Sequence, residues 1–119
     1  MAKGLAIYDD NSYEIKEFKH LDDYKSVVNG WIERLAMYSV KDGQSGSIYI
    51  NELGKIDRLK LNRTATLIGW LGSAMYSDDV IVGNVIILGK DDGEGGDTDV
   101  DQMWIDIASH HCTERKSNV

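Results

Sequence analysis

The sequence contains no proline and a single cysteine, Cys112. Without proline, turns must be made by Gly, Asn, Asp and Ser, and no native cis-proline step can slow folding. One cysteine excludes an internal disulfide, so nothing in the sequence indicates an oxidising compartment. No apolar run is long enough to cross a bilayer, and the first residues lack the apolar core of a secretory signal. Together these absences predict a cytoplasmic protein with no membrane association.

Basic residues are also scarce. The chain has 13 Lys and Arg against 20 Asp and Glu, a formal net charge of −7. Because proteins that bind phosphate backbones usually carry a basic face, direct nucleic-acid binding is not expected. The length of 119 residues and the hydrophobic content of 42% are enough for one core. We therefore expect one domain over residues 1–119. Its net negative charge suits a partner with a basic surface.

Periodic patterns predict an α+β fold, with a mostly antiparallel sheet of about five to six strands and two to three helices packed on it. Alternating or β-branched runs predict strands at 5–8, 13–18, 31–38 and 47–51, the first two forming a hairpin. Two further runs, 80–82 and 85–88, predict one strand that is bent at 83–84 and covered on both faces.

Helical spacing of apolar residues predicts three helices. The first covers 21–28, and the Asn29-Gly30 pair stops it. The second follows Asn62, which is a good N-cap. The third carries Val100, Met103, Trp104 and Ile107 on one face, with Thr98 or Asp99 as its cap. Residues 90–98 are expected to form a mobile, acidic, glycine-rich loop, and residues 113–119 a frayed tail.

No metal, cofactor or catalytic site is predicted. The run 97–101 has the alternating carboxylates that open a calcium loop, but Gln102 and Ala108 stand where that loop needs Gly and Glu. Residues 110–112, His-His-Cys, diverge on a helix and do not make a zinc site. The run 93–96 lacks the Lys-Ser/Thr ending of a phosphate-binding loop. With no catalytic signature present, enzyme activity has no positive support.

Arg63 is the one charged residue whose position the sequence pattern does not explain. If Asn62 caps the helix, Arg63 lies in its first turn, where the helix dipole disfavours a cation by about 0.3–1 kcal/mol. Arg63 either pairs with an acidic group, such as Asp57 or one from the last helix, or helps free helix N–H groups to hold an anion. Asn62, Arg63 and Thr66 are therefore a candidate binding set.

Acidic side chains are concentrated in the 90–98 segment, where Asp91, Asp92, Glu94 and Asp97 form a second candidate set. Surface carboxylates can imitate DNA phosphates and occupy a nucleic-acid-binding enzyme. The net charge is moderate for that role, and these acids lie in one glycine-rich loop instead of along a rigid face.

Three blocks of sequence resemble a family of domains of unknown function (number 3846) that is common in tailed-phage genomes. They are Ile50-Asn51-Glu52-Leu53-Gly54-Lys55, then Leu61-Asn62-Arg63-Thr64-Ala65-Thr66, then the run 79–89 with Asp79, Ile81-Val82-Gly83-Asn84 and Gly89. The blocks occur in the family's order. The resemblance implies a phage-encoded accessory protein in the cytoplasm of an infected bacterial host, with no established activity or cofactor.

Several functions stay open at this point. The leading hypothesis is a small non-enzymatic binding protein that engages a host or phage protein. The alternatives are an acidic DNA mimic, and a small-ligand or nucleotide-handling protein that uses the helix start at Asn62 and Arg63. Self-association is a further alternative, because three tryptophans and six tyrosines exceed what one small core readily accommodates.

Overall fold

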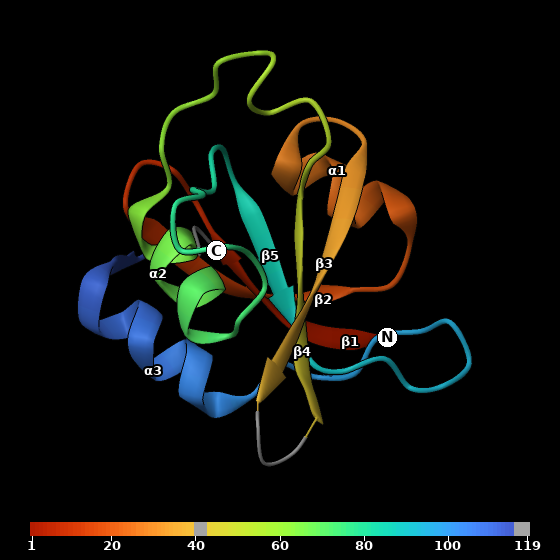
Figure 1. The fold of residues 1–119 in the computed structure, drawn as a ribbon. Helices are drawn as coiled ribbons and strands as arrows, with labels where there is room; N and C mark the ends of the chain where they lie inside the picture. Colours follow the sequence, from red (N-terminus) through yellow and green to blue (C-terminus); the bar gives the residue numbers. More distant parts are fainter. Residues whose placement is uncertain (40–42, 116–119) are drawn as a thin grey trace.

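Six strands form one sheet in the part of the chain that the computed structural model describes, residues 1–39 and 43–115 (Figure 1). Their order across the sheet is β3-β4-β5-β1-β2-β6, and all neighbours are antiparallel except β2 and β6. The strands are β1 Ala2–Ile7, β2 Ser12–Phe18, β3 Ile32–Ser39, β4 Gly43–Asn51, β5 Val85–Leu88 and β6 Thr113–Glu114. With three helices, this is the α+β fold that the sequence predicts.

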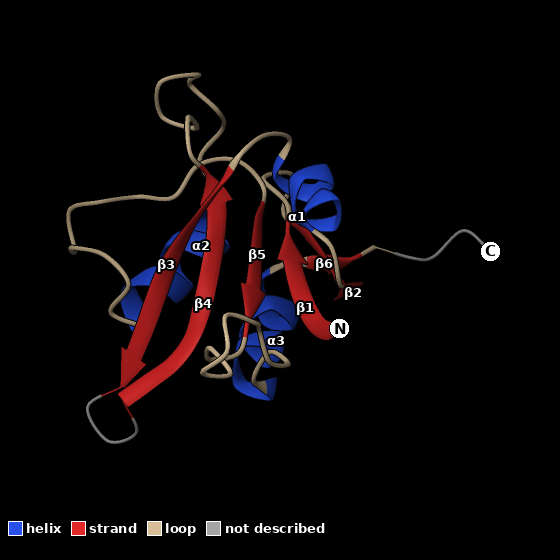
Figure 2. Ribbon diagram, turned by 90° about the vertical axis from the view of Figure 1, so that its right-hand side faces the viewer, coloured by secondary structure: helices blue, strands red, loops and turns tan. Residues whose placement is uncertain are grey.

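The helices cover the two faces of the sheet unequally (Figures 1 and 2). α1, Leu21–Val28, packs on one face, where its buried Val27 and Val28 join Phe18 and Ile86. α2, Arg63–Leu71, and α3, Gln102–His111, cover the other face. The predicted first helix is confirmed with its bounds, and Asn29, in the left-handed conformation, ends it. No helix in the described residues is long and apolar enough to cross a membrane.

β5 lies at the centre of this arrangement, between β4 and β1. All four of its side chains are buried. Val85 and Ile87 pack with α2 and α3, whereas Ile86 and Leu88 pack with α1. Because burial of one such side chain is worth about 1.5–3 kcal/mol, this short strand contributes much of the core. The prediction that both of its faces are covered is confirmed.

The run 80–82 does not belong to a strand, so the prediction of one bent strand over 80–88 is wrong in its first half. The backbone of Ile81 is held by α2: its N–H donates to Thr66 Oγ1 at 2.9 Å, and its carbonyl accepts from Asn62 N–H at 2.9 Å. Gly83 then turns the chain with a φ of 78°. These tertiary hydrogen bonds replace the ladder that a β-branched run would otherwise form.

The cap of α3 also differs from the prediction. Asp101 is the N-cap residue, and its Oδ1 accepts from Met103 N–H at 2.9 Å. Thr98 and Asp99 have other partners, because Thr98 donates to the Lys90 carbonyl and Asp99 accepts from Lys3 N–H. α3 therefore begins at Gln102, three residues after Asp99 joins the loop to β1.

The start of the predicted frayed tail is paired. Thr113 and Glu114 form β6 beside β2, and the guanidinium of Arg115 stacks on the Tyr8 ring at 3.4 Å from its centroid. Residues 116–119 lie outside the described part of the chain. The parallel β2–β6 pairing was not predicted, because two residues are too short to show a period.

Candidate functional site

A hollow of about 330 Å³ opens on the α2 side of β3 and β4. We call it the apolar hollow. Its apolar lining is Leu35, Ile50, Ile56, Ala74, Met75, Tyr76, Val80, Ile81 and Val82, and its polar lining is Glu33, Asn51, Glu52, Lys55 and Asp79. Its floor is formed by residues of β3 and β4, and its walls by residues of the segments 52–61 and 72–82. Such a concave, mainly apolar surface with a few polar groups is typical of binding sites.

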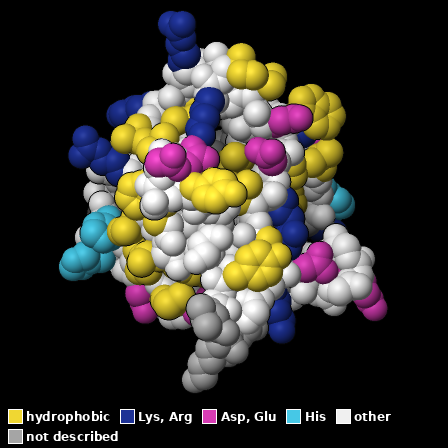
Figure 3. All heavy atoms as spheres, in the orientation of Figure 1, with side chains coloured by type: hydrophobic (Ala, Val, Ile, Leu, Met, Phe, Trp, Pro, Cys, Tyr) yellow, Lys and Arg dark blue, Asp and Glu magenta, His cyan; other side chains and the backbone are white. Residues whose placement is uncertain are grey.

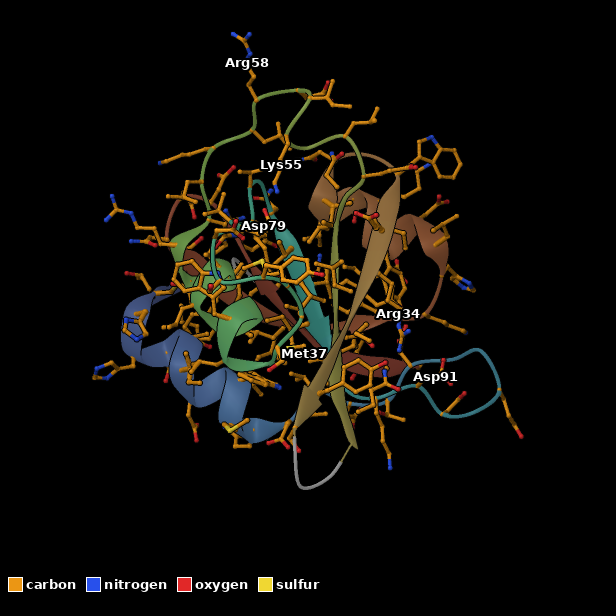
Figure 4. All side chains as sticks on the ribbon, viewed as in Figure 1. Arg34, Met37, Lys55, Arg58, Asp79 and Asp91 are labelled. Carbon is orange, nitrogen blue, oxygen red and sulfur yellow. The ribbon has the colours of Figure 1, made fainter. Side chains whose placement is uncertain are left out.

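An ion pair between Lys55 and Asp79 joins the two walls (Figure 4). Asp79 also accepts the N–H of Val80 at 2.8 Å, and its own carbonyl accepts from Trp70 Nε1 at 2.9 Å. The Lys55 ammonium, and then the Val80 N–H, hold the pKa of the Asp79 carboxyl below its usual value. The walls are thus tied to each other and to α2.

Backbone hydrogen bonds position the 72–82 wall against the sheet and α2. Gly72 accepts from Tyr38 N–H of β3 at 2.8 Å, and Ala74 N–H donates to the Gly69 carbonyl at 2.9 Å. A Cβ on Gly72 would lie 2.5 Å from Met37 Sδ, so the close approach to β3 depends on glycine. The 72–82 wall is therefore held in place by hydrogen bonds and packing, as a fixed part of the fold.

The 52–61 wall is organised by Asn51 at the end of β4. Its Nδ2 donates to the Val28 carbonyl at 3.1 Å, and its Oδ1 accepts from Leu53 N–H at 2.9 Å. The turn closes where Leu59 N–H donates to the Gly54 carbonyl, also at 2.9 Å. Asn51 therefore connects this wall to α1 on the far face of the sheet.

Large apolar side chains stand exposed around the mouth of the hollow. Ile56 is 78% exposed and Tyr76 is 85% exposed, and Val80 is also exposed. In Figure 3, hydrophobic side chains gather on the near face with acidic side chains among them. Exposed apolar groups beside a concavity are typical of sites that bind another molecule.

The candidate set at α2 separates into two buried residues and one exposed residue. Asn62 is 1% exposed; its Oδ1 accepts from Ala65 N–H, and its Nδ2 donates to the carbonyls of Ile7 and Gly83. The buried Thr66 hydroxyl is held by Asn62 and Ile81. Both side chains therefore use their polar atoms inside the protein.

Arg63 is exposed and lines a second, polar hollow of about 250 Å³ with Asp9, Asp10, Asn11, Lys60 and Leu61. Within the described ranges, no carboxylate lies within ion-pair distance of its guanidinium, and neither Asp57 nor α3 supplies one. Asp10 is paired instead with Arg115, at 3.0 Å. The Ser12 hydroxyl, and to a lesser extent Arg115, hold the pKa of the Asp10 carboxyl below its usual value.

The acidic loop is fastened by its own carboxylates. Asp97 accepts from the hydroxyls of Tyr24 and Tyr49, each at 2.8 Å. Burial, and then this carboxylate, raise the pKa of both phenols. Asp92 accepts the N–H groups of Glu94 and Gly96 at 2.7 and 3.0 Å.

Asp91 makes a similar turn by accepting from Gly93 N–H at 2.6 Å. Of the four acids in this candidate set, only Glu94 has a carboxylate without a partner in the described part of the chain. The described residues also contain no group of three or more His, Cys, Asp or Glu arranged to hold a metal ion. Asp91 and Asp92 thus stabilise the backbone of the loop, and Asp97 joins the loop to Tyr24 and Tyr49.

The apolar hollow is a candidate site that the sequence did not predict. Its walls are loops, which carry no hydrophobic period, but one signal was present. The first and third blocks of the family resemblance supply Asn51, Glu52 and Lys55 on one side and Asp79 on the other. The second block contributes Asn62, which binds the Gly83 carbonyl. The first and third blocks therefore meet at the hollow, whereas the second is linked to it through the hydrogen bonds of Asn62 and Thr66 with the backbone of Ile81.

The chain is similar over residues 2–111 to the model of one protein family, described as a domain of unknown function, DUF3846. Because the match covers most of the chain, this protein belongs to that family. Neither the curated proteins nor the solved structures that were searched contain a match to the chain.

Proposed function

We propose that this protein is a small non-enzymatic binding protein that docks a host or phage protein in the apolar hollow. The observation that carries the proposal is the exposure of Ile56 and Tyr76 at the mouth of a preformed, mainly apolar concavity. Clustered apolar groups of this kind lose their contact with water when a partner binds, which supplies most of the driving force of association.

The setting of the proposal is the cytoplasm of an infected bacterium. It rests on the resemblance of the three sequence blocks to a phage-associated family. The absence of a disulfide-forming cysteine pair and of a long apolar run supports it. The excess of seven negative charges supports a partner with a basic surface.

Substitutions at the mouth test the proposal without disturbing the core. Ile56→Ser and Tyr76→Ser remove highly exposed apolar side chains, so the fold should keep its stability. Met103→Ser on α3 is the matched control, since Met103 is also an exposed apolar residue but does not line the hollow. Tagged protein is incubated with lysate of infected cells, and the captured protein is identified and purified.

Affinity for the purified partner is then measured with each variant. We expect Ile56→Ser and Tyr76→Ser each to weaken binding by roughly tenfold, because each removes an apolar contact worth about 1–2 kcal/mol. Met103→Ser should bind like the unsubstituted protein. If all three variants bind the partner as tightly as the unsubstituted protein does, or if no specific partner is captured, the hollow is not the docking site.

A second candidate function is the binding of a small anionic ligand at the polar hollow. The observation in its favour is the exposed Arg63 guanidinium, which has no ion-pair partner in the described ranges, beside Lys60. Asp9 and Asp10 oppose it by adding negative charge to the same hollow. A thermal-shift screen with nucleotides and phosphorylated metabolites tests it, because a real ligand raises the melting temperature with concentration, and Arg63→Ala should abolish that rise.

DNA mimicry by the acidic loop has weaker structural support. Asp91, Asp92 and Asp97 accept hydrogen bonds from their own loop or from Tyr24 and Tyr49. Three of the four carboxylates are therefore engaged within the protein, and only Glu94 has no partner in the described part of the chain. Binding of the captured partner by a variant with Asn and Gln at the four acidic positions would exclude this function.

A further inference from the structure

β3 is an edge strand, and part of its edge is open (Figure 2). In an antiparallel ladder, backbone groups point alternately toward the neighbouring strand and away from it. The Trp31 carbonyl accepts from Glu52 N–H and so points toward β4, whereas Tyr38 N–H donates to Gly72 and points outward. The alternation between them directs the N–H and carbonyl groups of Ile32, Arg34 and Ala36 to the open edge.

No described residue forms a hydrogen bond with those outward-pointing backbone groups. The one backbone hydrogen bond from this edge to another described segment is that of Tyr38, at the far end of the strand. The irregularity in the β3–β4 pairing also lies at this end, between Met37 and Tyr38. About five residues of regular strand, 32–36, are therefore available for pairing, which is the usual length of a strand.

The open edge runs beside the apolar hollow. Glu33 and Leu35 of β3 line the hollow, because their side chains point to the face opposite that of Ile32. In Figure 2, the segment between α2 and β5 extends outward past β3. A strand added to β3 would thus lie beside this segment. The residues opposite Glu33 and Leu35 would project toward the hollow, since paired residues place their side chains on the same face.

The charge of the hollow indicates which side chains a bound extended segment should carry. Three carboxylates line it, those of Glu33, Glu52 and Asp79, against one cation, Lys55. Lys55 is already paired with Asp79, and no described cation pairs with Glu33 or Glu52. Two negative charges near the open edge therefore favour Lys or Arg in the incoming segment.

We propose that the open edge of β3 takes up an extended peptide segment of the partner protein as an added strand. The segment places an apolar side chain in the hollow and flanking Lys or Arg side chains near Glu33 and Glu52. This inference rests on the proposed function and names its mode of recognition. Main-chain hydrogen bonds to β3 supply affinity, and the hollow supplies specificity.

The test begins with peptides selected from a displayed random library on the immobilised full-length protein. We expect the selected sequences to alternate apolar residues with other residues and to be rich in Lys and Arg. The best synthetic peptide is added to the unsubstituted protein, and amide hydrogen exchange is measured. Exchange should slow at Ile32, Arg34 and Ala36, whereas the Tyr38 amide, which already has a partner, should change little.

Two variants of one residue separate the main chain from the side chain. Arg34→Pro removes an outward N–H, which edge strands tolerate, and Arg34→Ala removes the same side chain but keeps the N–H. We expect roughly tenfold weaker peptide binding for Arg34→Pro and little change for Arg34→Ala. Glu33→Gln with Glu52→Gln should weaken binding and reduce its salt dependence. If Arg34→Pro unfolds, hydrogen exchange on the unsubstituted protein still decides the question.

The outcomes distinguish this inference from the proposed function. Peptides that lose affinity with Ile56→Ser and Tyr76→Ser but leave the β3 amides unprotected would overturn strand addition and keep the hollow as the docking site. Peptides whose binding none of these variants changes would overturn both. Protection of the β3 amides in the free protein, with a molecular mass in light scattering that rises with concentration, would assign the edge to a second copy and overturn the peptide proposal.

Discussion

The Nζ atom of Lys55 and a carboxylate oxygen of Asp79 form an ion pair that connects the two loop walls of the apolar hollow, 24 residues apart in the sequence. Both side chains are partly exposed, so the pair is screened by water. Its main effect is on the geometry of the mouth, because it joins two loops that are otherwise held separately, the first through Asn51 and the second through the hydrogen bonds of Tyr38 and Trp70.

We expect Asp79→Asn to destabilise the protein by about 0.2–1 kcal/mol at neutral pH, since the amide loses the charge but can still accept from Val80 N–H. The folded-state pKa of Asp79 is lowered, so its contribution is present above the unfolded value and is lost as the pH falls through the folded value. Urea denaturation of both proteins should show a stability difference at pH 7 that shrinks below about pH 4. Asp78→Asn, at an exposed neighbour, is the control.

Asn62 should be among the least replaceable polar residues of the described chain. Asn62→Ala removes the α2 cap and leaves the buried carbonyls of Ile7 and Gly83 without their donor. We expect a loss of about 3 kcal/mol or more in unfolding free energy. Asn62→Asp keeps the cap but not the donors, so it separates the two effects. Equal stability of Asn62→Asp and the unsubstituted protein would show that the two carbonyl contacts contribute nothing.

The parts of the fold that the sequence predicted are those where local pattern and tertiary environment agree. The helical spacing of 21–28 describes an element with one buried face, and the continuous apolar run 85–88 describes a strand that is buried on both faces. The strand prediction for 80–82 was wrong because β-branched composition indicates burial and not strand pairing. Ile81 is buried, but its backbone forms hydrogen bonds with α2 and its cap instead of with a neighbouring strand. Local propensity yields to such tertiary partners.

The candidate site was less predictable than the fold for a physical reason. Asn62 was correctly predicted as a cap, but its two further hydrogen bonds run to segments distant in sequence, which no local pattern contains. The apolar hollow depends on the spacing of two loops and on the close approach of Gly72 to Met37. The family blocks that contain Lys55 and Asp79 fall on these two loops, but nothing in the sequence gives the distance between them.

Asp97 should act as the anchor of the acidic loop, and Glu94 should not. Asp97→Ala removes the acceptor of the Tyr24 and Tyr49 hydroxyls, so we expect a loss of about 1–3 kcal/mol and faster amide exchange over residues 90–98. Glu94→Gln, at an exposed position without a partner in the described chain, should leave both unchanged.

The tyrosines give this contact a pH dependence of opposite sign to that of Asp79. Burial and Asp97 raise the folded-state pKa of Tyr24 and Tyr49, so their contribution is complete below the unfolded value, near pH 10, and is lost as the pH rises further. Stability measured between pH 8 and 11 should fall less steeply in Tyr49→Phe than in the unsubstituted protein. Parallel curves would contradict the assignment of this titration to Tyr49.

Arg115 should stabilise the β2–β6 edge of the sheet. Its guanidinium lies 3.4 Å from the centroid of the Tyr8 ring, its Nε donates to Ser12 Oγ at 2.7 Å, and its Nη2 lies 3.0 Å from Asp10 Oδ2. A partly exposed cation–π contact and an exposed ion pair together are worth about 1–2 kcal/mol. Arg115→Ala should therefore lower the unfolding free energy by that amount, and less so at high salt.

Two variants show which property of Arg115 matters. Arg115→Lys keeps the charge but loses the planar group that stacks on Tyr8, so its stability should be intermediate. Arg58→Ala is the control, because Arg58 points into solvent from the tip of the 52–61 wall (Figure 4). If Arg115→Ala and Arg58→Ala unfold at the same urea concentration, the segment 113–115 contributes nothing to stability through Arg115, and its pairing with β2 must depend on the backbone hydrogen bonds to Asn11 and Tyr13.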